Sequence, residues 1–172
     1  MGERFGWDRG LEFEVVKAKL ESRLERAKRD REYGYLAVLY VQLLNGARLS
    51  EAIEALQKFA ATGERKVRVK VRKRKNAERL IIIPRSIDLR RAAWLAEADP
   101  RVLKSTIASY AVRKLKFNTH SLRYALITHL ARKGIAPQLI ARITGHARLD
   151  YVLHYTQQTT AEKLLGELVE GE

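Results

Sequence analysis

The chain has 172 residues and no cysteine, and its 34 Lys and Arg against 20 Asp and Glu give a formal net charge of +14. This composition excludes disulfides and thiolate metal sites, its four histidines lack the spacing of zinc ligands, and no apolar run reaches the length of a membrane span. We therefore expect a cytoplasmic protein, in a nucleoid or host-cell interior, with no metal, cofactor, signal peptide or membrane partner. The excess of basic residues favours nucleic acid as the partner. The alternative explanation of this excess is a charged surface of the kind found in thermophile proteins.

The first 32 residues are expected to form an N-terminal extension, residues 1–32, built around one charged helix. From Leu11 to Arg31, apolar residues recur every three or four positions, which predicts an amphipathic helix with these inward residues: Phe13, Val16, Leu20, Leu24 and Ala27. A denser apolar stretch from Tyr33 to Leu44 predicts a buried helix, which Asn45 and Gly46 end.

Arg48 lies in the short link between this buried helix and the next one. Ser50 is expected to cap a helix over Glu51–Phe59, with Glu51 in its first turn. The link would then hold Arg48 between two helix ends, although a surface arginine is the simplest interpretation of this residue by itself.

Residues 65–75 are the most basic stretch of the chain. Valines alternate here with cations, which predicts a strand with one basic face, and residues 78–83 predict a returning strand that Pro84 ends. We expect a β-hairpin whose cations contact DNA phosphates: Arg65, Lys66, Arg68, Lys70, Arg72, Lys73 and Arg74. A charged edge that prevents aggregation is the alternative interpretation.

Helices are predicted for most of the remaining chain. Ser86 is expected to cap a helix that reaches about Ala98, and Asp99-Pro100 begins another that reaches about Leu115. A helix over His120–Lys133, ended by Gly134, and a helix opened by Pro137 together resemble a helix-turn-helix.

The end of the chain is expected to hold two more helices. Residues 149–155 predict a short one. Thr159 and Glu162 form a capping-box pattern for a C-terminal helix within residues 159–172, with one apolar face made of Leu164, Leu165, Leu168 and Val169.

Four residues of the last third carry groups suited to phosphate chemistry. His120 and Arg123 are three positions apart, so they share one face of a helix. His146 follows a glycine, and Tyr155 lies nine residues further on. Together they offer a fixed cation for phosphate oxygens, imidazoles that can carry protons near neutral pH, and an oxygen nucleophile.

Arg48, a hairpin lysine, His120-Ser-Leu-Arg123, Gly145-His146 and Tyr155 occur in this order, and the order resembles the catalytic domain of the tyrosine recombinase family of phage-type integrases. The resemblance covers residues 33–158. It implies a mainly α fold with a small β-hairpin, and an enzyme that acts on double-stranded DNA without metal or ATP.

The resemblance also implies a role for each residue. Arg48 and Arg123 would hold the non-bridging oxygens of the scissile phosphate. Tyr155 would attack phosphorus in line, form a 3′-phosphotyrosyl bond and free a 5′-hydroxyl, while His120 would help remove the tyrosine proton. His146 would hydrogen-bond a phosphate oxygen, and a hairpin lysine would protonate the leaving 5′-oxygen.

Some assignments stay open at the level of sequence. The hairpin offers Lys70, Lys73 and Lys75 as the catalytic lysine, and counting back from Pro84 and Arg79 places Lys75 best at the turn, with Lys73 second. The glycine usual beside this lysine in the family is missing, so the register of the turn stays open. Tyr151 competes with Tyr155, although the interval from His146 selects Tyr155.

The assembly and the exact task stay open as well. About 30 residues precede the helix at Tyr33, too few for the N-terminal DNA-clamping domain usual in the family, so we expect either an excised catalytic fragment or a minimal recombinase of viral or archaeal kind. Related recombinases assemble as tetramers on DNA and often dock their last helix on a neighbouring subunit, although this helix could equally fold back on its own domain. A non-catalytic helix-turn-helix protein and a type IB topoisomerase are the rival functions.

Overall fold

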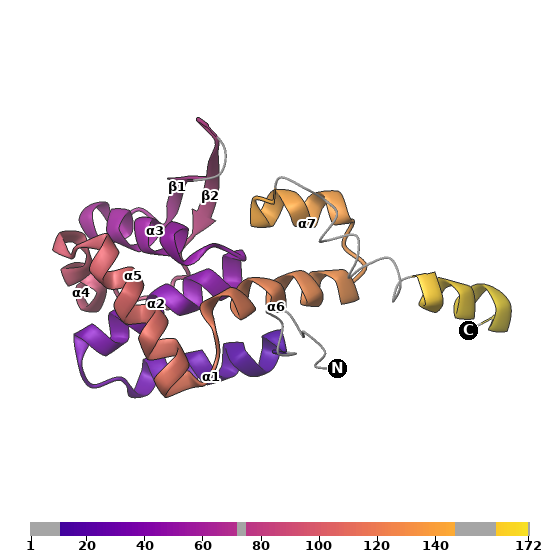
Figure 1. Ribbon diagram of the computed structural model, residues 1–172, viewed down its shortest axis with the longest axis horizontal. Helices are drawn as coiled ribbons and strands as arrows, with labels where there is room; N and C mark the ends of the chain where they lie inside the picture. The colour runs from indigo at the N-terminus through magenta and orange to yellow at the C-terminus, as the bar shows by residue number, and fades with distance from the viewer. Residues whose placement is uncertain (1–10, 72–74, 147–160, 172) are drawn as a thin grey trace, which may run out of the picture.

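A computed structural model describes residues 11–71, 75–146 and 161–171 of the protein (Figure 1). Its elements, in chain order, are α1 (Phe13–Arg26), α2 (Asp30–Asn45), α3 (Leu49–Thr62), β1 (Lys66–Lys70), β2 (Glu78–Ile82), α4 (Leu89–Ala92), a 3₁₀ helix (Ala93–Glu97), α5 (Pro100–Tyr110), a π-helical turn (Ala111–Leu115), α6 (Thr119–Arg132) and α7 (Pro137–Thr144). The predicted architecture, mainly α with one small hairpin, is confirmed.

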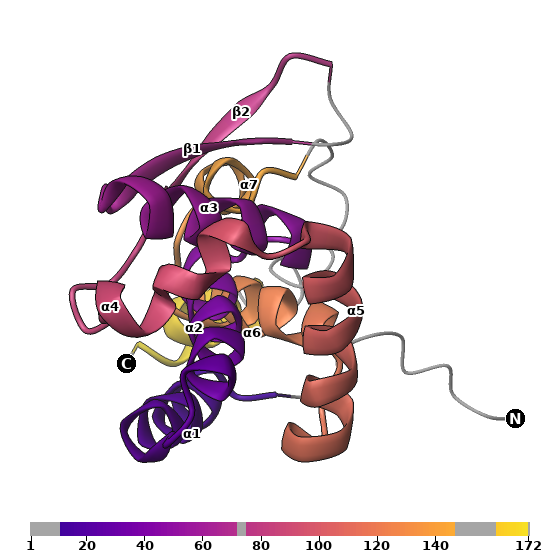
Figure 2. The same ribbon diagram turned by 90° about the vertical axis from the view of Figure 1, so that its left-hand side faces the viewer.

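Helix α2 forms the centre of the core. Every residue from Leu36 to Leu43 is buried, and α1, α3 and α6 all pack against this helix. Figures 1 and 2 show α1 on one side of α2 and α3 on the other. A helix that is apolar on all sides is stable only when it is covered on all sides, so the dense apolar stretch explains the central position.

Several predicted helix boundaries are wrong. The first helix ends at Arg26 instead of Arg31 because the backbone at Ala27 is extended, and α2 begins at Asp30, where acidic residues favour a helix start. Helix α3 begins one residue before Ser50, and its N-cap is Arg48, whose backbone N–H donates to Glu51 Oε2 at 3.0 Å.

Another wrong boundary is that of the helix expected to start at Ser86. Asp88 caps α4 instead, since its carboxylate accepts the backbone N–H of Arg90 at 2.8 Å. By contrast, the predicted start at Asp99-Pro100 is confirmed, with Asp99 as the N-cap of α5.

The hairpin pairs β1 and β2 antiparallel, with Val67 opposite Ile81 and Val69 opposite Arg79. These four positions are buried, and they face the body of the molecule, whereas Lys66, Arg68 and Lys70 alternate with them and are exposed. The predicted basic face of the strand is therefore present.

Arg65 differs from the other cations that we expected on the DNA surface. Its Nη1 and Nη2 donate to the carbonyl oxygens of Pro84, at 2.5 Å, and Ile87, at 3.0 Å, and its guanidinium lies over the ring of Phe59. Arg65 thus anchors the base of the hairpin, and we leave it out of the proposed DNA surface. Arg72, Lys73 and Arg74 lie outside the described residues.

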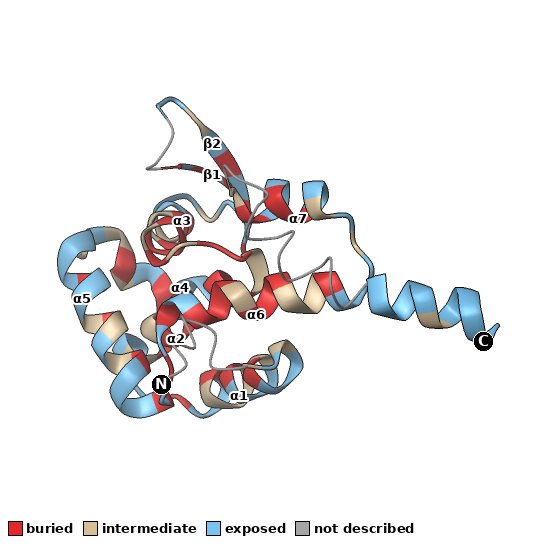
Figure 3. Ribbon diagram, turned by 45° about the vertical axis from the view of Figure 1, so that its right-hand side comes forward, coloured by how far each residue is buried: buried red, intermediate tan, exposed pale blue. Residues whose placement is uncertain are grey.

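Residues 161–170 form a helix that extends away from the body of the molecule (Figures 1 and 3). Its apolar residues are largely exposed, from 51% of the surface of Leu164 to 83% of that of Leu168. The predicted helix over 149–155 and the cap residue Thr159 lie outside the described residues. Within the described part of the chain, no helix is both long and apolar enough to traverse a bilayer.

Candidate active site

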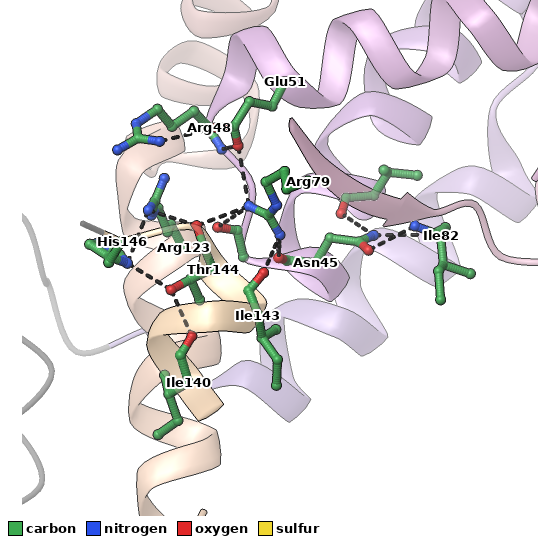
Figure 4. Close-up of polar contacts among 12 residues, drawn as sticks. Asn45, Arg48, Glu51, Arg79, Ile82, Arg123, Ile140, Ile143, Thr144 and His146 are labelled. Carbon is green, nitrogen blue, oxygen red and sulfur yellow. Dashed lines mark hydrogen bonds and ion pairs between the residues drawn. The ribbon is translucent and has the colours of Figure 1, made fainter. Parts of the chain in front are cut away.

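The ends of three helices and one strand meet at a cluster of charged side chains (Figure 4). Arg48 comes from the start of α3, Arg123 from the second turn of α6, and His146 from the residues after α7. Arg79 enters from the buried face of β2. The structure therefore brings together three of the predicted site residues, which lie up to 98 positions apart in the sequence.

Arg123 is the most deeply buried of the three, with 3% of its surface exposed. Its Nη2 donates to the carbonyl oxygen of Thr144 at 2.8 Å and lies 3.0 Å from Nδ1 of His146. Nε and Nη1 are buried and have no hydrogen-bond partner among the described residues. A buried donor without a partner is unfavourable, so this guanidinium is prepared to bind an acceptor such as a phosphate oxygen.

Burial and neighbouring charges shift the pKa of Arg123. Burial lowers this pKa most, the charge of Arg48 lowers it further, and the net result is a pKa of about 10. The guanidinium stays protonated at neutral pH, but its charge is less well compensated than in water. An anion placed between Arg48 and Arg123 would supply the missing compensation.

His146 is neutral at physiological pH. Burial lowers its pKa first, then the charges of Arg123, Arg48 and Arg79, to about 3. A guanidinium can only donate, so Nδ1 of His146 accepts from Arg123 and the ring proton sits on Nε2. The expectation that this imidazole carries protons near neutral pH is therefore wrong for His146, whose ring proton belongs to Nε2.

Glu51 holds Arg48 in place. The Glu51 carboxylate is 1% exposed, and its Oε1 accepts from Nη1 of Arg48 at 3.0 Å. Oε2 accepts the backbone N–H of Arg48 at 3.0 Å and Nη1 of Arg79 at 3.2 Å. From the sequence, Glu51 was expected only to favour the start of a helix, and its ion pairs with two arginines were missed.

Arg79 is the site residue that sequence reasoning overlooked. It is 7% exposed and donates to the carbonyl oxygens of Asn45 at 2.5 Å, Thr144 at 3.0 Å and Ile143. Burial lowers its pKa, and the charge of Glu51 opposes this shift. The alternation of β2 carried the signal, because an arginine occupies the same buried face as Ile81.

Gly46 allows the ends of α2 and α7 to approach. It ends α2 with a φ of 57°, and a Cβ at this position would lie 2.7 Å from Cγ2 of Thr144. Both the positive φ and the close approach require glycine. Thr144 is fully buried, and its hydroxyl oxygen lies 2.8 Å from the carbonyl oxygen of Ile140 and 2.7 Å from Nδ1 of His146.

Of the remaining predicted site residues, His120 and Lys75 are exposed and the others are not described. His120 is exposed in the first turn of α6, where its backbone N–H donates to Asn118 Oδ1 at 2.9 Å. Lys75 is exposed next to Asn76, which has a φ of 58°, in the turn of the hairpin. Tyr155, Tyr151 and Lys73 lie outside the described residues.

The site is built for an anion. Three guanidinium groups face one carboxylate and one neutral imidazole, which leaves positive charge uncompensated. Within the described ranges, no group of three or more His, Cys, Asp or Glu side chains could hold a metal ion. The arrangement can bind a phosphate group by charge-assisted hydrogen bonds and stabilise negative charge on its oxygens.

Comparisons with known proteins point in the same direction. The family model of the phage integrase family matches residues 15–162. A protein of Acidianus two-tailed virus named "Putative integrase ORF241" is 39% identical, covering 95% of this chain and 69% of its own length. An uncharacterized protein of Methanocaldococcus jannaschii is 29% identical, over 94% of this chain and 88% of its own length. A Sputnik virophage protein, named "Putative integrase V10", is 25% identical, over 95% of this chain and 91% of its own length. No solved structure shows a significant match.

Proposed function

This chain belongs to the phage integrase family, and we propose that it is a site-specific recombinase that cleaves and rejoins double-stranded DNA through a covalent bond to Tyr155. One observation carries the proposal. Arg123 is buried with two donor nitrogens that have no partner among the described residues, beside Arg48 and the Nε2–H of His146. This is the donor set that a phosphodiester needs.

In the proposed reaction, Arg48, Arg123 and His146 bind the two non-bridging oxygens of the scissile phosphate. As the tyrosine oxygen attacks, negative charge grows on these oxygens, and the donors stabilise it without reorganising. Their positions are set by Glu51 and by the carbonyl of Thr144, so the orientation of the phosphate is fixed before attack.

The bonds and protons balance without another reactant. The bond from the Tyr155 oxygen to phosphorus forms as the bond from phosphorus to the 5′-oxygen breaks. The phenol proton passes to His120 or to water, and Lys75 or Lys73 gives a proton to the leaving 5′-oxygen. The phosphotyrosine retains the energy of the broken bond, so the 5′-hydroxyl of another strand can reverse the reaction.

Exposed cations of the hairpin supply the proposed DNA surface. Lys66, Arg68 and Lys70 project from the exposed face of β1. We add Arg72, Lys73 and Arg74 from the sequence. Lysines and arginines on phosphates fix the position of a protein on the duplex without reading its sequence.

The helix over residues 161–170 is proposed to pack on a neighbouring subunit in a tetramer assembled on DNA. Its four exposed apolar side chains support this idea, since burying one leucine or valine contributes about 1.5–3 kcal/mol. The same segment, 159–172, would then couple the activity of adjacent subunits.

A nicked suicide duplex tests the proposed chemistry. Cleavage releases a short fragment that diffuses away, so the protein becomes trapped on the 3′-phosphate as a band of reduced mobility in a denaturing gel. Wild-type protein should form this band, and Tyr155→Phe should not, while both bind the duplex equally. If Tyr151→Phe loses the band and Tyr155→Phe retains it, Tyr151 is the nucleophile.

The same experiment separates the rival functions. A non-catalytic helix-turn-helix protein built on α6 and α7 would bind the duplex and give no covalent band. A type IB topoisomerase would give the band and would also relax supercoiled plasmid as a monomer. Exchange of strands between two sites distinguishes a recombinase from both.

A further inference from the structure

We propose that Arg79 is a positioning residue, which locks the phosphate-binding groups to one another and to the hairpin. The effect of this positioning role on DNA cleavage rests on the proposed function. Arg79 does not need to touch DNA for this role. It acts through the residues that hold Arg48, Arg123 and His146, and Figure 4 shows its guanidinium beside these three residues, between Glu51 and Ile143.

The first support is that Arg79 shares its acceptors with both phosphate-binding arginines. Its Nη1 donates to the carbonyl of Thr144 at 3.0 Å, and Nη2 of Arg123 donates to the same oxygen at 2.8 Å. Its Nη1 also lies 3.2 Å from Oε2 of Glu51, whose other oxygen binds Arg48. A displacement of Arg79 therefore displaces an acceptor of each arginine.

The second support is that two helices end at this guanidinium. Asn45 is the last residue of α2, and Ile143 and Thr144 are the last of α7, and their carbonyl oxygens accept from Arg79. The final carbonyls of a helix have no partner within the helix and carry the negative end of its dipole. The guanidinium of Arg79 donates to the last carbonyls of both α2 and α7. It therefore holds the end of α7, and with it His146, against the end of α2.

The third support is steric. Gly145 follows α7 with a φ of 71°, and a Cβ at this position would lie 3.3 Å from Cδ of Arg79. The backbone between Thr144 and His146 thus rests directly on the Arg79 side chain. Arg79 also lies four residues after Lys75 in the hairpin, so the same strand connects the catalytic lysine candidate to the phosphate-binding groups.

A mutational comparison tests the role. Arg79→Gln and Arg79→Lys remove the planar fork, and Arg79→Lys keeps the positive charge. Arg91→Gln is the matched control, because it removes the same charge from a partly buried arginine away from the site. Arg91 likewise donates to a carbonyl, that of Ala27, and to a carboxylate, that of Asp30. All variants are compared by melting temperature, by affinity for duplex DNA and by the single-turnover rate of covalent-complex formation.

We expect both Arg79 variants to slow covalent-complex formation about 100-fold, the loss typical of a displacement near 1 Å, with the affinity for DNA within about threefold of wild type. Arg91→Gln should lower the melting temperature and leave the rate unchanged. If Arg79→Gln and Arg91→Gln lose similar stability and both cleave at the wild-type rate, Arg79 only stabilises the fold and the proposal is overturned.

A readout independent of catalysis separates this proposal from the proposed function. In ¹⁵N NMR spectra of the DNA-free protein at pH 7, Nδ1 of His146 should show the shift of a hydrogen-bonded acceptor, and Arg79→Gln should change this shift while Arg91→Gln should not. An unchanged signal contradicts the positioning role even if the wild-type protein forms no covalent complex. If both Arg79 variants fail to fold, spectra of the wild-type protein test the proposal instead. Separate signals for Nη1 and Nη2 of Arg79 would show that its guanidinium is held in place and would support the positioning role. A single averaged signal would overturn it.

Discussion

Nη2 of Arg123 lies 3.0 Å from Nδ1 of His146, so a permanent cation donates to a neutral imidazole at the centre of the site. Because a guanidinium can only donate, this contact places the ring proton of His146 on Nε2. It also makes the protonation of His146 unfavourable, which has a measurable consequence for stability.

The free energy of unfolding should fall as the pH drops below about 6.5, and His146→Gln should weaken this dependence. The pKa of His146 is about 3 in the folded chain, because of burial and of Arg123, Arg48 and Arg79, against an ordinary value of 6.5. Between these values the unfolded chain binds a proton that the folded chain does not, so acid favours unfolding. Urea titrations at pH 7.5, 6, 5 and 4 measure the effect.

The control for this experiment is His129→Gln. The pKa of His129 is also lowered, by burial first, but this residue lies at the far end of α6 against Phe13 and Glu14. At each pH, the free energy of unfolding of each variant is subtracted from that of the wild type. The difference no longer contains the contribution of the carboxylates, which is the same in both proteins. A slope for His146→Gln equal to that of wild type would show that His146 is not held neutral in the folded protein.

The Lys75→Ala variant should cleave an ordinary duplex more slowly than the wild type. It should cleave at the wild-type rate when sulfur replaces the 5′-bridging oxygen of the duplex. Sulfur leaves readily without a proton, so the loss of a general acid stops mattering. Cleavage rates on the two substrates provide the measurement, with Lys73→Ala in parallel. Rescue of Lys73→Ala alone would assign the acid to Lys73, and rescue of neither would leave the hairpin as a binding element only.

The affinity for duplex DNA should decrease steeply with salt, and replacing Lys66, Arg68 and Lys70 by Gln should reduce that dependence. Each phosphate contact contributes about 0.9 to the slope of log K against log salt. All three side chains are exposed on one face of β1. Fluorescence anisotropy between low and high salt measures the slope.

A triple Gln variant of Arg101, Lys104 and Lys114 is the matched control for the hairpin variant. These cations are also exposed but lie on α5 and the turn that follows it, and their removal changes the net charge equally. Equal slopes for the two triple variants would mean that net charge, and not the hairpin, governs binding.

Deleting residues 159–172 should leave the melting temperature of the isolated chain and its binding to a single site almost unchanged, while synapsis and strand exchange fall sharply. The reason is that Leu164, Leu165, Leu168 and Val169 are exposed and contribute little to the core of their own chain. Calorimetry and gel assays of two-site complexes provide the measurements. A large drop in melting temperature would show that the helix packs in cis.

The sequence predicted those parts of the fold that depend on local patterns. Apolar density identified α2, and alternation identified the hairpin and its exposed cations. The caps at Ser50 and Ser86 were wrong although serine is a favoured N-cap residue, because contacts outside the local pattern overrode it. The burial of Leu49 and the carboxylate of Asp88 decided the boundaries instead.

The site was predictable only in part, and for a physical reason. Arg48, Arg123 and His146 were identified by their order and intervals, and the structure brings them together. Apart from the carboxylate of Glu51, the acceptors of Arg79 include the backbone carbonyls of Asn45, Ile143 and Thr144. Any residue type would supply these carbonyls, so no pattern of side chains could reveal the contacts with them. Such contacts arise from tertiary packing alone.

Because Arg79 and Arg123 both hold the carbonyl of Thr144, the chain leaves α7 from a fixed point directly beside the phosphate-binding groups. Tyr155 follows His146 by nine positions, and a fully extended chain of nine residues spans about 30 Å at most. The nucleophile that we propose can therefore reach only phosphates within about that distance of the end of α7. The anchored end of α7 thus limits which phosphates the Tyr155 of one chain could attack, at its own site or at that of a neighbouring subunit.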